Sequence, residues 1–386
     1  MEEETKLGWV NPGMLLPVVR NATGRPHGEV ASWTTKRIYG GIGRALGVFR
    51  VVGEAVDRGE PFTWSVVVKV VGVGRGAVDN PAAWNYWKRE ALAFESRALE
   101  QLPGGVVAPR CWGVTQLEVG AVAIWLEELR DDGPSSWSLA DYGQAARHFG
   151  CFNAAYLRGE RPLDHSWYSH DWMKGRVEAC ATPVALLLEH RDNPWIQRMH
   201  PPDVLERILR VWEEREWFYR VIAGLPQTFC HQDAFRRNLF RRGHAHEETV
   251  AIDWAGAGIA PIGAEMVPLV VTTVGMHEFE LERWRELEGA ALAGYLQGLN
   301  EGGWKGDPRL PRLGYAASVI LRFGVPGSLQ VATLLNEQQW PELEKSVGCP
   351  IGELCDFWAR VRRSVVLPFA EETQRLARDL RLGVSS

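Results

Sequence analysis

Residues 230–240 read CHQDAFRRNLF, and after a short polar break residues 250–256 read VAIDWAG. The first stretch contains His231, Asp233 and Asn238, and the second brings a lone carboxylate, Asp253, after an apolar run. A buried carboxylate or amide costs several kcal/mol unless it is paired, so packed interiors rarely collect such residues by accident. The pattern therefore predicts either a set of turn caps or a site that holds a metal ion and a reacting group.

Length and composition limit the class of protein. A chain of 386 residues is long for one core and predicts two or three structural units. The net charge of -5 provides no basic field, which argues against a nucleic-acid partner. The six scattered cysteines are expected to be reduced. The polar, acidic start does not have the pattern of a signal peptide, and the apolar stretches are too short to span a membrane. We therefore expect a soluble, cytoplasmic protein, and the sequence gives no expectation for its oligomeric state.

The hydrophobic pattern changes near residue 130. Before it, apolar β-branched runs flank the glycine cluster GGIGRALG at 40–47, and one helix is expected over 80–102, where Asn80 caps and Pro81 suits the first turn. Beyond 135 the spacing is helical. The pattern predicts an α+β, bilobal fold with a small antiparallel β-sheet lobe with one helix (1–130) and a larger, mainly helical lobe (131–386). The first thirty or so residues lack a clear period and either cover the small lobe or are mobile.

Two features of the first lobe fit nucleotide binding. A glycine turn with Gly41 and Gly43 lets backbone N–H groups approach phosphate oxygens, although a plain hairpin turn has the same composition. Lys69 interrupts a β-branched run, and Glu90 follows 21 residues later in the expected helix. Such a pair can hold an ammonium group over nucleotide phosphates. Glu95 competes for the helix position, and an exposed lysine with an unpartnered glutamate is the alternative.

Two features of the second lobe fit phosphoryl transfer. The spacing His231-x-Asp233-x-x-x-x-Asn238 is typical of a catalytic loop, in which Asp233 accepts or orients a hydroxyl proton and Asn238 ligates Mg²⁺. His231 is expected to brace the loop. Asp253 ends an apolar run twenty residues later and supplies the carboxylate that a hard Mg²⁺ ion prefers. Each feature alone is a weak signal, but the four in this order predict a phosphotransferase.

With these motifs the chain resembles the aminoglycoside phosphotransferase and choline kinase-like enzymes, which share the protein-kinase-like bilobal fold. The resemblance runs from about residue 36 to 300 and is sharpest at HQDAFRRN (231–238) and AIDWAGAGIAPIGAEM (251–266). It implies ATP and Mg²⁺ as cofactors and transfer of the gamma-phosphate to a hydroxyl of a small molecule. An aminoglycoside or other antibiotic and a metabolic sugar or amino alcohol are equally compatible acceptors.

The resemblance also implies residue roles. The hinge that binds adenine falls at Glu127 to Leu129. Lys69 is then the lysine that contacts the nucleotide phosphates, and Glu90 is its partner. Asp233 is the catalytic aspartate, and the two metal ligands are Asn238 and Asp253.

The chain departs from the family pattern inside the loop. Phe235 stands two residues past the catalytic aspartate, where relatives often have His or Lys near the transferred phosphate. Arg236 or Arg237 then either supplies the positive charge or pairs with acidic side chains. Glu265 occupies a position where relatives often have aspartate, and it either braces the loop or faces substrate.

Two other functions remain open. A nucleotide-binding pseudokinase fits if Phe235 and the two arginines have disabled transfer. A protein kinase fits less well, because no Asp-Phe-Gly or Ala-Pro-Glu segment is found. HAHEE at 244–248 is interpreted as a solvated loop tip in preference to a metal cluster. The segment HSWYSHDW at 165–172 either packs or touches substrate through His165, Tyr168, His170 and Asp171.

Overall fold

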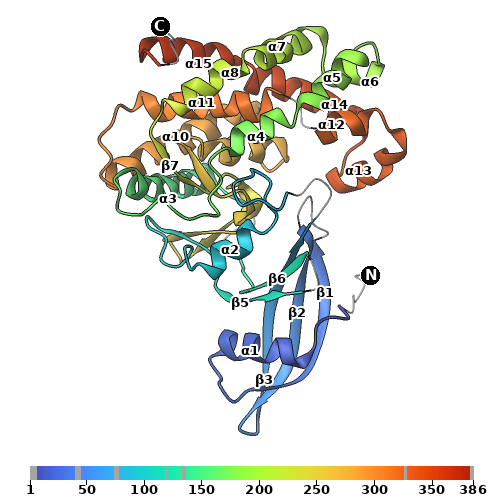
Figure 1. The fold of residues 1–386 in the computed structure, drawn as a ribbon, viewed down its shortest axis with the longest axis vertical. Helices are drawn as coiled ribbons and strands as arrows, with labels where there is room; N and C mark the ends of the chain where they lie inside the picture. Colours follow the sequence, from blue (N-terminus) through green and yellow to red (C-terminus); the bar gives the residue numbers. More distant parts are fainter. Residues whose placement is uncertain are drawn as a thin grey trace.

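The chain divides into an N-terminal sheet and a mostly helical remainder (Figure 1). The computed structural model describes residues 7–39, 45–73, 78–117, 120–132, 136–325 and 328–382. Gly41 and Gly43 therefore lie outside the described residues. The sheet is antiparallel with the order β1-β2-β3-β6-β5. Its strands are β1 (Glu29–Tyr39), β2 (Ala45–Asp57), β3 (Glu60–Gly72), β5 (Cys111–Gln116) and β6 (Ala121–Leu126).

The period of two in β3 determines where Lys69 points. Lys69 lies opposite Val48 of β2 and Ile124 of β6, in the middle of the sheet. Its neighbours Val68 and Val70 belong to the hydrophobic cluster on one face of the sheet, whereas Val71 belongs to the cluster on the other face. Successive strand residues point to opposite faces, so Lys69 shares the face of Val71. That face is covered by Tyr86, Trp87 and Ala91.

Helix α1 (Pro12–Thr23) covers the opposite face of the sheet and was not predicted as a helix. The side chain of Asn11 caps it, and a proline stands in its first turn. Leu15, Val18 and Val19 are buried in one cluster with strand residues such as Val66. The described part of residues 1–130 therefore has two α-helices, where one was expected, and α1 of the N-terminal segment covers the sheet.

The helix expected over 80–102 is much shorter in the structure. Only α2 (Arg89–Glu95) is helical, and residues 80–88 form turns. On the N-terminal side of α2, the guanidinium group of Arg89 stabilises these turns, because it donates hydrogen bonds to the backbone carbonyls of Pro81, Ala83 and Trp84. The carbonyl of Ala83 also accepts the backbone N–H of Tyr86, three residues on, which is the bond of a turn and not that of an α-helix. Tertiary contacts have overridden the helical pattern of the sequence.

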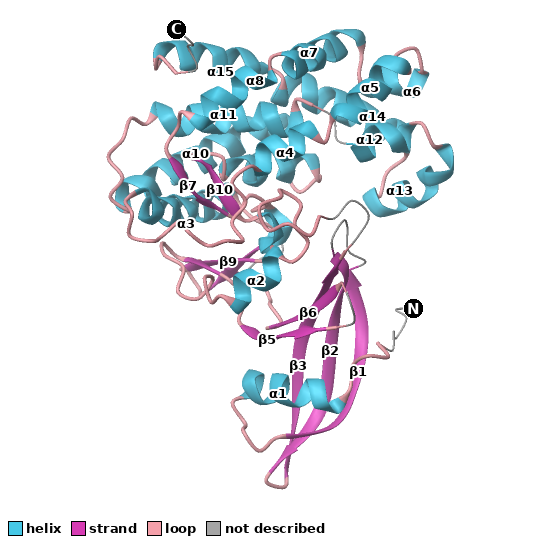
Figure 2. Ribbon diagram, viewed as in Figure 1, coloured by secondary structure: helices cyan, strands magenta, loops and turns pink. Residues whose placement is uncertain are grey.

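The rest of the chain is built mainly of helices, coloured cyan in Figure 2. The described helices are α3 (Leu139–Leu157), α4 (Trp172–Glu178), α5 (Ala181–Glu189), α6 (Pro194–Met199), α7 (Pro202–Glu213), α8 (Arg215–Ala223), α9 (Thr273–Gly275), α10 (Trp284–Glu301), α11 (Arg309–Phe323), α12 (Ser328–Leu334), α13 (Trp340–Val347), α14 (Ile351–Val361) and α15 (Pro368–Asp379). Short 3₁₀ or π turns are η1 (Arg236–Asn238), η2 (Trp254–Gly256), η3 (Pro268–Thr272), η4 (Leu281–Arg283), η5 (Glu337–Gln339) and η6 (Arg362–Val366). Within the described ranges, no helix combines the length and the apolar character that a membrane crossing requires.

Two small sheets lie between the N-terminal sheet and the helices and carry the motif residues. One pairs β7 (Gln227–Cys230) with β10 (Gly258–Pro261), and the other has the order β4-β9-β8. Its strands are β4 (Val106–Val107), β8 (Leu239–Arg242) and β9 (Glu248–Ala251). The loop 231–238 joins β7 to β8, and Asp253 follows β9. Both motifs are thus fixed at strand ends.

A buried histidine network joins α3 to β9. The hydroxyl of Thr249 contacts Nδ1 of His148 at 2.8 Å and Nε2 of His246 at 2.9 Å. Burial lowers the pKa of both histidines to about 4. His246 is therefore a packed residue and not part of a solvated tip, whereas His244 in the same HAHEE segment is exposed.

We predict that the network makes stability depend on pH. The unfolded state binds a proton to each histidine near pH 6.5, but the folded state does so only near pH 4. The contribution of these two histidines to the free energy of unfolding is therefore fully present above pH 6.5. It is lost as the pH falls from 6.5 toward 4, by about 2 kcal/mol per histidine. Urea unfolding of wild type and His246→Gln between pH 7 and pH 4.5 measures this dependence. His246→Gln should have the shallower slope, and His244→Gln should match wild type. Equal slopes in all three proteins would contradict the assignment.

Candidate functional site

The site is organised around Lys69. Its Nζ lies 2.6 Å from Oε2 of Glu90 in α2 and 2.7 Å from Oδ1 of Asp253. Residues 69, 90 and 253 come from three separate segments, and their contact joins the N-terminal sheet to the small sheets beneath the helices. Glu90, and not the exposed Glu95, is the partner in α2. A further bond runs from the backbone N–H of Trp254 to Oε1 of Glu90 at 3.3 Å.

The two ion pairs keep Lys69 charged in a buried place. Burial by itself lowers the pKa of Lys69, but the carboxylates of Asp253 and Glu90 outweigh it and raise that pKa above its usual value. Burial raises the pKa of Glu90, and the ammonium group of Lys69 opposes this shift. A buried ion pair of this kind gives little net stability, whereas removing one partner is strongly destabilising. Its geometry therefore serves to fix the position of the ammonium group.

His231 braces the loop that follows β7. Its Nδ1 accepts a hydrogen bond from the backbone N–H of Asp233 at 3.1 Å, and its Nε2 donates to the carbonyl of Ile252 at 2.9 Å. This pattern needs the neutral imidazole, and burial lowers the pKa of His231 to about 4. The imidazole thus ties the segment of Asp233 to the strand end that precedes Asp253.

Glu265 holds the same loop from beneath. Its carboxylate accepts the backbone N–H groups of His231 at 2.7 Å and Gln232 at 3.1 Å. Burial raises the pKa of Glu265 to about 7, against the effect of these two N–H groups. Glu265 was expected either to brace the loop or to face substrate. The residue is fully buried and bonds the loop backbone, so it braces the loop.

Asp233, Asn238 and Asp253 offer hard oxygen ligands. The amide nitrogen of Asn238 donates to the carbonyl of Asp233 at 2.9 Å and to its Oδ2 at 3.2 Å, so the other end of the amide, its oxygen, is the atom that could accept a metal ion. The side chains of Asp233 and Asp253 remain 33% and 39% exposed. Burial raises the pKa of Asp233, and Arg322 opposes this shift. Asp253 has a left-handed backbone with φ of 65°, a strained conformation that recurs at functional sites.

Arg236 and Arg237 do not face the reacting groups. The guanidinium of Arg236 lies 2.9 Å from Asp131 and over the ring of Trp137. The side chain of Arg237 is largely exposed and pairs with Glu278. Of the two expected arrangements, the structure therefore has the pairing with acidic side chains.

The cation near Asp233 comes instead from Arg322, which was missed in the sequence. Its Nη2 lies 2.8 Å from Oδ1 of Asp233. Arg322 stands 89 residues beyond Asp233, in the last turn of α11. In the sequence, Arg322 is a charged residue in an otherwise apolar helical run, which indicates that it is unusual. The run does not indicate which residue Arg322 pairs with.

The expected hinge lies where the chain leaves β6. The carboxylate of Glu127 accepts the backbone N–H of Arg110 at 3.0 Å and pairs with Arg242 of β8 at 2.6 Å. Its backbone N–H donates to the carbonyl of Arg110. The side chain of Glu127 therefore links the sheet to β8, and Leu129 follows it on the half-buried connecting segment.

The segment 165–172 mostly packs. Tyr168 is buried and stacks on Phe229 at 4.5 Å, and His165 stacks on Trp167 at 5.5 Å. His170 and Asp171 are exposed just before α4.

In the described part of the chain, no cluster of three or more His, Cys, Asp or Glu residues could hold a metal ion, and the six cysteines are free thiols.

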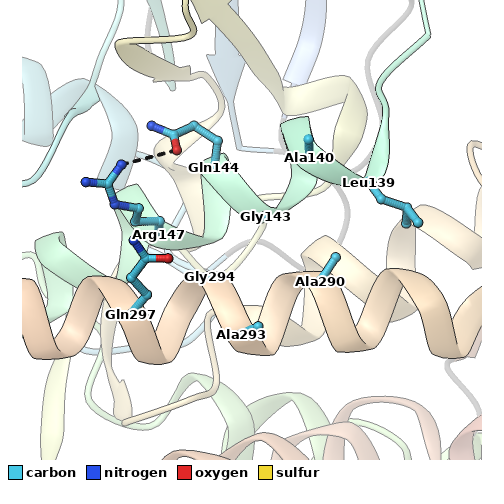
Figure 3. A pocket seen from close by; sticks show the side chains of 9 residues that line it. All are labelled: Leu139, Ala140, Gly143, Gln144, Arg147, Ala290, Ala293, Gly294 and Gln297. Atoms are coloured by element: carbon cyan, nitrogen blue, oxygen red, sulfur yellow. Dashed lines mark hydrogen bonds between the residues drawn. The ribbon is translucent and has the colours of Figure 1, made fainter.

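A pocket of about 420 Å³ lies elsewhere, between α3 and α10 (Figure 3). The helices approach closely there because Gly143 meets Gly294, where a Cβ would contact a backbone oxygen at 2.0 Å. Gln144 and Arg147 are bonded to each other beside it at 3.4 Å. None of its lining residues belongs to the candidate site, so helix packing accounts for this depression.

The sequence profile described as "Phosphotransferase enzyme family" matches residues 158–306. The family resemblance is confirmed. The matched phosphotransferase stretch includes Asp233, Asn238 and Asp253 but not Lys69 or Glu90. None of the curated proteins is similar enough to this chain in sequence to count as a match.

Solved phosphotransferase structures share the fold. The amicoumacin kinase hAmiN, solved with AMP-PNP, Ca²⁺ and Ami, has a TM-score of 0.53 at 11% identity, with 94% of this chain and 98% of that chain covered. A choline kinase from Cryptosporidium parvum Iowa II has a TM-score of 0.50 at 12% identity, with 96% and 97% covered. These likenesses confirm the α+β, kinase-like fold class.

A second missed residue, Arg89, fixes helix α2 and with it Glu90. Arg89 is fully buried beside Glu90 in the sequence. Besides the turn carbonyls of 81–84, its guanidinium donates to Trp167 at 2.9 Å and to Ala255 at 3.3 Å. Arg89 therefore connects α2 to the segment that follows Asp253. Bonds to several main-chain carbonyls satisfy a buried charge that would otherwise be very costly.

We predict that Arg89→Met lowers the free energy of unfolding by about 3 kcal/mol, because several main-chain carbonyls, including the buried one of Trp167, lose their donor. It should also weaken nucleotide binding, since α2 then no longer holds Glu90 against Lys69. Urea unfolding and calorimetric titration with Mg²⁺-ATP measure the two effects. Arg97→Met, at an exposed position just after α2, is the control and should change neither. Wild-type stability in Arg89→Met would contradict this role.

Proposed function

We propose that the protein is an ATP-dependent phosphotransferase that transfers the gamma-phosphate of ATP to a hydroxyl group of a small molecule. The observation that carries the proposal is the meeting of Lys69, Glu90 and Asp253 at distances of 2.6 and 2.7 Å. Three segments spread over 184 residues supply this constellation, beside a loop with the catalytic spacing. Family membership of residues 158–306 supports the same reaction class.

The residues suit each part of the reaction. Lys69 is the proposed contact for the nucleotide phosphates, and Glu90 fixes its position. Asp233 is the proposed catalytic aspartate, which orients the acceptor hydroxyl and takes its proton. Phosphoryl transfer depends mainly on positioning and on charge stabilisation, which such a rigid arrangement provides.

The oxygen donors fit a magnesium ion. The carboxylate of Asp253 and the amide oxygen of Asn238 are the proposed ligands, a hard donor set that leaves room for phosphate oxygens. A bound Mg²⁺ would neutralise charge on the phosphates. The adenine base is expected against the segment from Glu127 to Leu129, and we propose the lobe boundary near residue 130 at this segment.

The acceptor class follows from the relatives only in outline. The structurally similar proteins are described as kinases of amicoumacin and of choline. We therefore propose a small hydroxyl-bearing acceptor, either an antibiotic such as an aminoglycoside or a metabolic sugar or amino alcohol. A pseudokinase is the second candidate, favoured by Phe235 in the loop. The ion pair of Arg322 with Asp233 weighs against it, because the site retains a cation.

We predict that Asp233→Ala lowers phosphate transfer by about a thousand-fold while the affinity for Mg²⁺-ATP stays within about two-fold. A coupled ADP-release assay over a panel of aminoglycosides, other antibiotics, sugars and amino alcohols measures transfer. Asp203→Ala, at an exposed surface ion pair, is the control and should retain wild-type rates. Wild-type turnover by Asp233→Ala would refute its catalytic role.

We also predict that Asp253→Ala removes the dependence of nucleotide affinity on magnesium. The reason is that the variant lacks the proposed carboxylate ligand and one of the two partners of Lys69. Calorimetric titration with ATP, with and without Mg²⁺, measures this, and circular dichroism verifies folding. If Mg²⁺ strengthens ATP binding to the variant as much as to wild type, Asp253 is not a ligand.

A further inference from the structure

The contact between Arg322 and Asp233 has no counterpart among the sequence motifs. Nη2 of Arg322 lies 2.8 Å from Oδ1 of Asp233, and Nη1 donates to the backbone carbonyl of Gln232. The side chain of Arg322 is only 10% exposed, so water screens this ion pair weakly. Two directed bonds to adjacent residues fix both the carboxylate and the backbone of the loop.

The guanidinium of Arg322 is itself held firmly. It lies over the ring of Trp172 of α4 at 4.9 Å and beside Phe323 at 5.6 Å. The backbone carbonyl of Arg322 accepts a hydrogen bond from Arg176, also of α4. Helices α4 and α11 therefore pre-organise the cation before any ligand arrives.

The other cations near the loop are engaged elsewhere. Position 235 is a phenylalanine, and Arg236 and Arg237 are paired with Asp131 and Glu278. Lys69 is held between Glu90 and Asp253. Arg322 is thus the cation that contacts the carboxylate at which the acceptor hydroxyl must arrive.

We propose that Arg322 is a positioning residue for phosphoryl transfer: it orients Asp233 toward the acceptor and supplies, from α11, the positive charge that Arg236 and Arg237 of the loop, paired elsewhere, do not supply at Asp233. This inference rests on the proposed function. In the transfer, the acceptor oxygen forms a bond to the gamma-phosphorus and gives its proton to Asp233. The bond from that phosphorus to the bridging oxygen breaks, and ADP leaves with the electron pair.

The charge on the transferred group explains why this position matters. The three outer oxygens of the phosphoryl group carry negative charge throughout the transfer. Beside an uncompensated Asp233 carboxylate they would be repelled. The guanidinium balances the carboxylate, and each of its terminal nitrogens has a second N–H beyond the bond described. Removal of one such preorganised donor typically costs a hundred-fold or more in rate.

The test compares Arg322→Met and Arg322→Lys with Arg312→Met. Arg312 stands in the same helix, where it pairs with Glu288 and Glu372 away from the site. Turnover is measured as ADP release from Mg²⁺-ATP, with water as acceptor and with the acceptor panel, and the nucleotide dissociation constant is measured separately. Arg322→Met should lower kcat about a hundred-fold. Its nucleotide affinity should stay within about two-fold, and Arg322→Lys should recover about ten-fold of the loss because the charge is restored. Arg312→Met should lower the melting temperature and leave kcat near wild type.

The outcomes separate the inference from the proposed function. A wild-type kcat in Arg322→Met, while Asp233→Ala is inactive, overturns the inference and leaves the phosphotransferase intact. Equal losses of kcat in Arg322→Met and Arg312→Met also overturn it, because a general effect of helix α11 then accounts for the loss. If Arg322→Met fails to fold, the Arg322→Lys variant decides: a wild-type kcat or a lost nucleotide affinity in that variant overturns the inference. Absence of turnover by wild type with every acceptor, water included, refutes the proposed function itself.

Discussion

The ammonium group of Lys69 joins the N-terminal sheet to α2 and to the segment that follows β9 through two short ion pairs. A lysine in the middle of a buried strand would be prohibitively costly alone, and the carboxylates of Glu90 and Asp253 compensate it. Loss of either carboxylate would leave a buried charge with half of its partners. The position of β3, of α2 and of the segment after β9 is therefore constrained by one cation, and a site built this way is rigid before ligands bind.

The loop that carries Asp233 depends on a second layer of contacts. His231 and Glu265 use neutral imidazole and carboxylate acceptors to fix its backbone, and Arg322 fixes its carboxylate. Arg89 does the same for α2 through main-chain carbonyls. These buried polar groups fix the positions of the loop and of α2 and add little to the free energy of unfolding. The reason is that the free energy lost when each group is removed from water is offset only by its well-formed hydrogen bonds. The arrangement suits a reaction that proceeds by orientation and charge balance.

The hydrophobic pattern predicted a strand-rich part followed by a helical one, and the family resemblance carried by the motifs implied the kinase-like α+β fold; both the fold class and the phosphotransferase resemblance are confirmed. The motif spacing had a further use. It also indicated which residues would meet, because strand ends and the loop between them bring Asp233, Asn238 and Asp253 together. Arg322 and Arg89 could not be found this way: their partners are 89 residues away or are backbone carbonyls, which leave no sequence signal. The helix expected over 80–102 is confined to Arg89–Glu95, and before it the buried guanidinium group of Arg89 stabilises turns through main-chain carbonyls that leave no sequence signal.

The central claim is that this site transfers the gamma-phosphate of ATP to a hydroxyl group. Phosphorus NMR of the protein with Mg²⁺-ATP and the acceptor panel tests it most directly. The account predicts a new phosphomonoester signal that grows in step with ADP for at least one acceptor. Tight nucleotide binding with neither ADP nor a phosphomonoester for any acceptor would contradict it and would favour the pseudokinase.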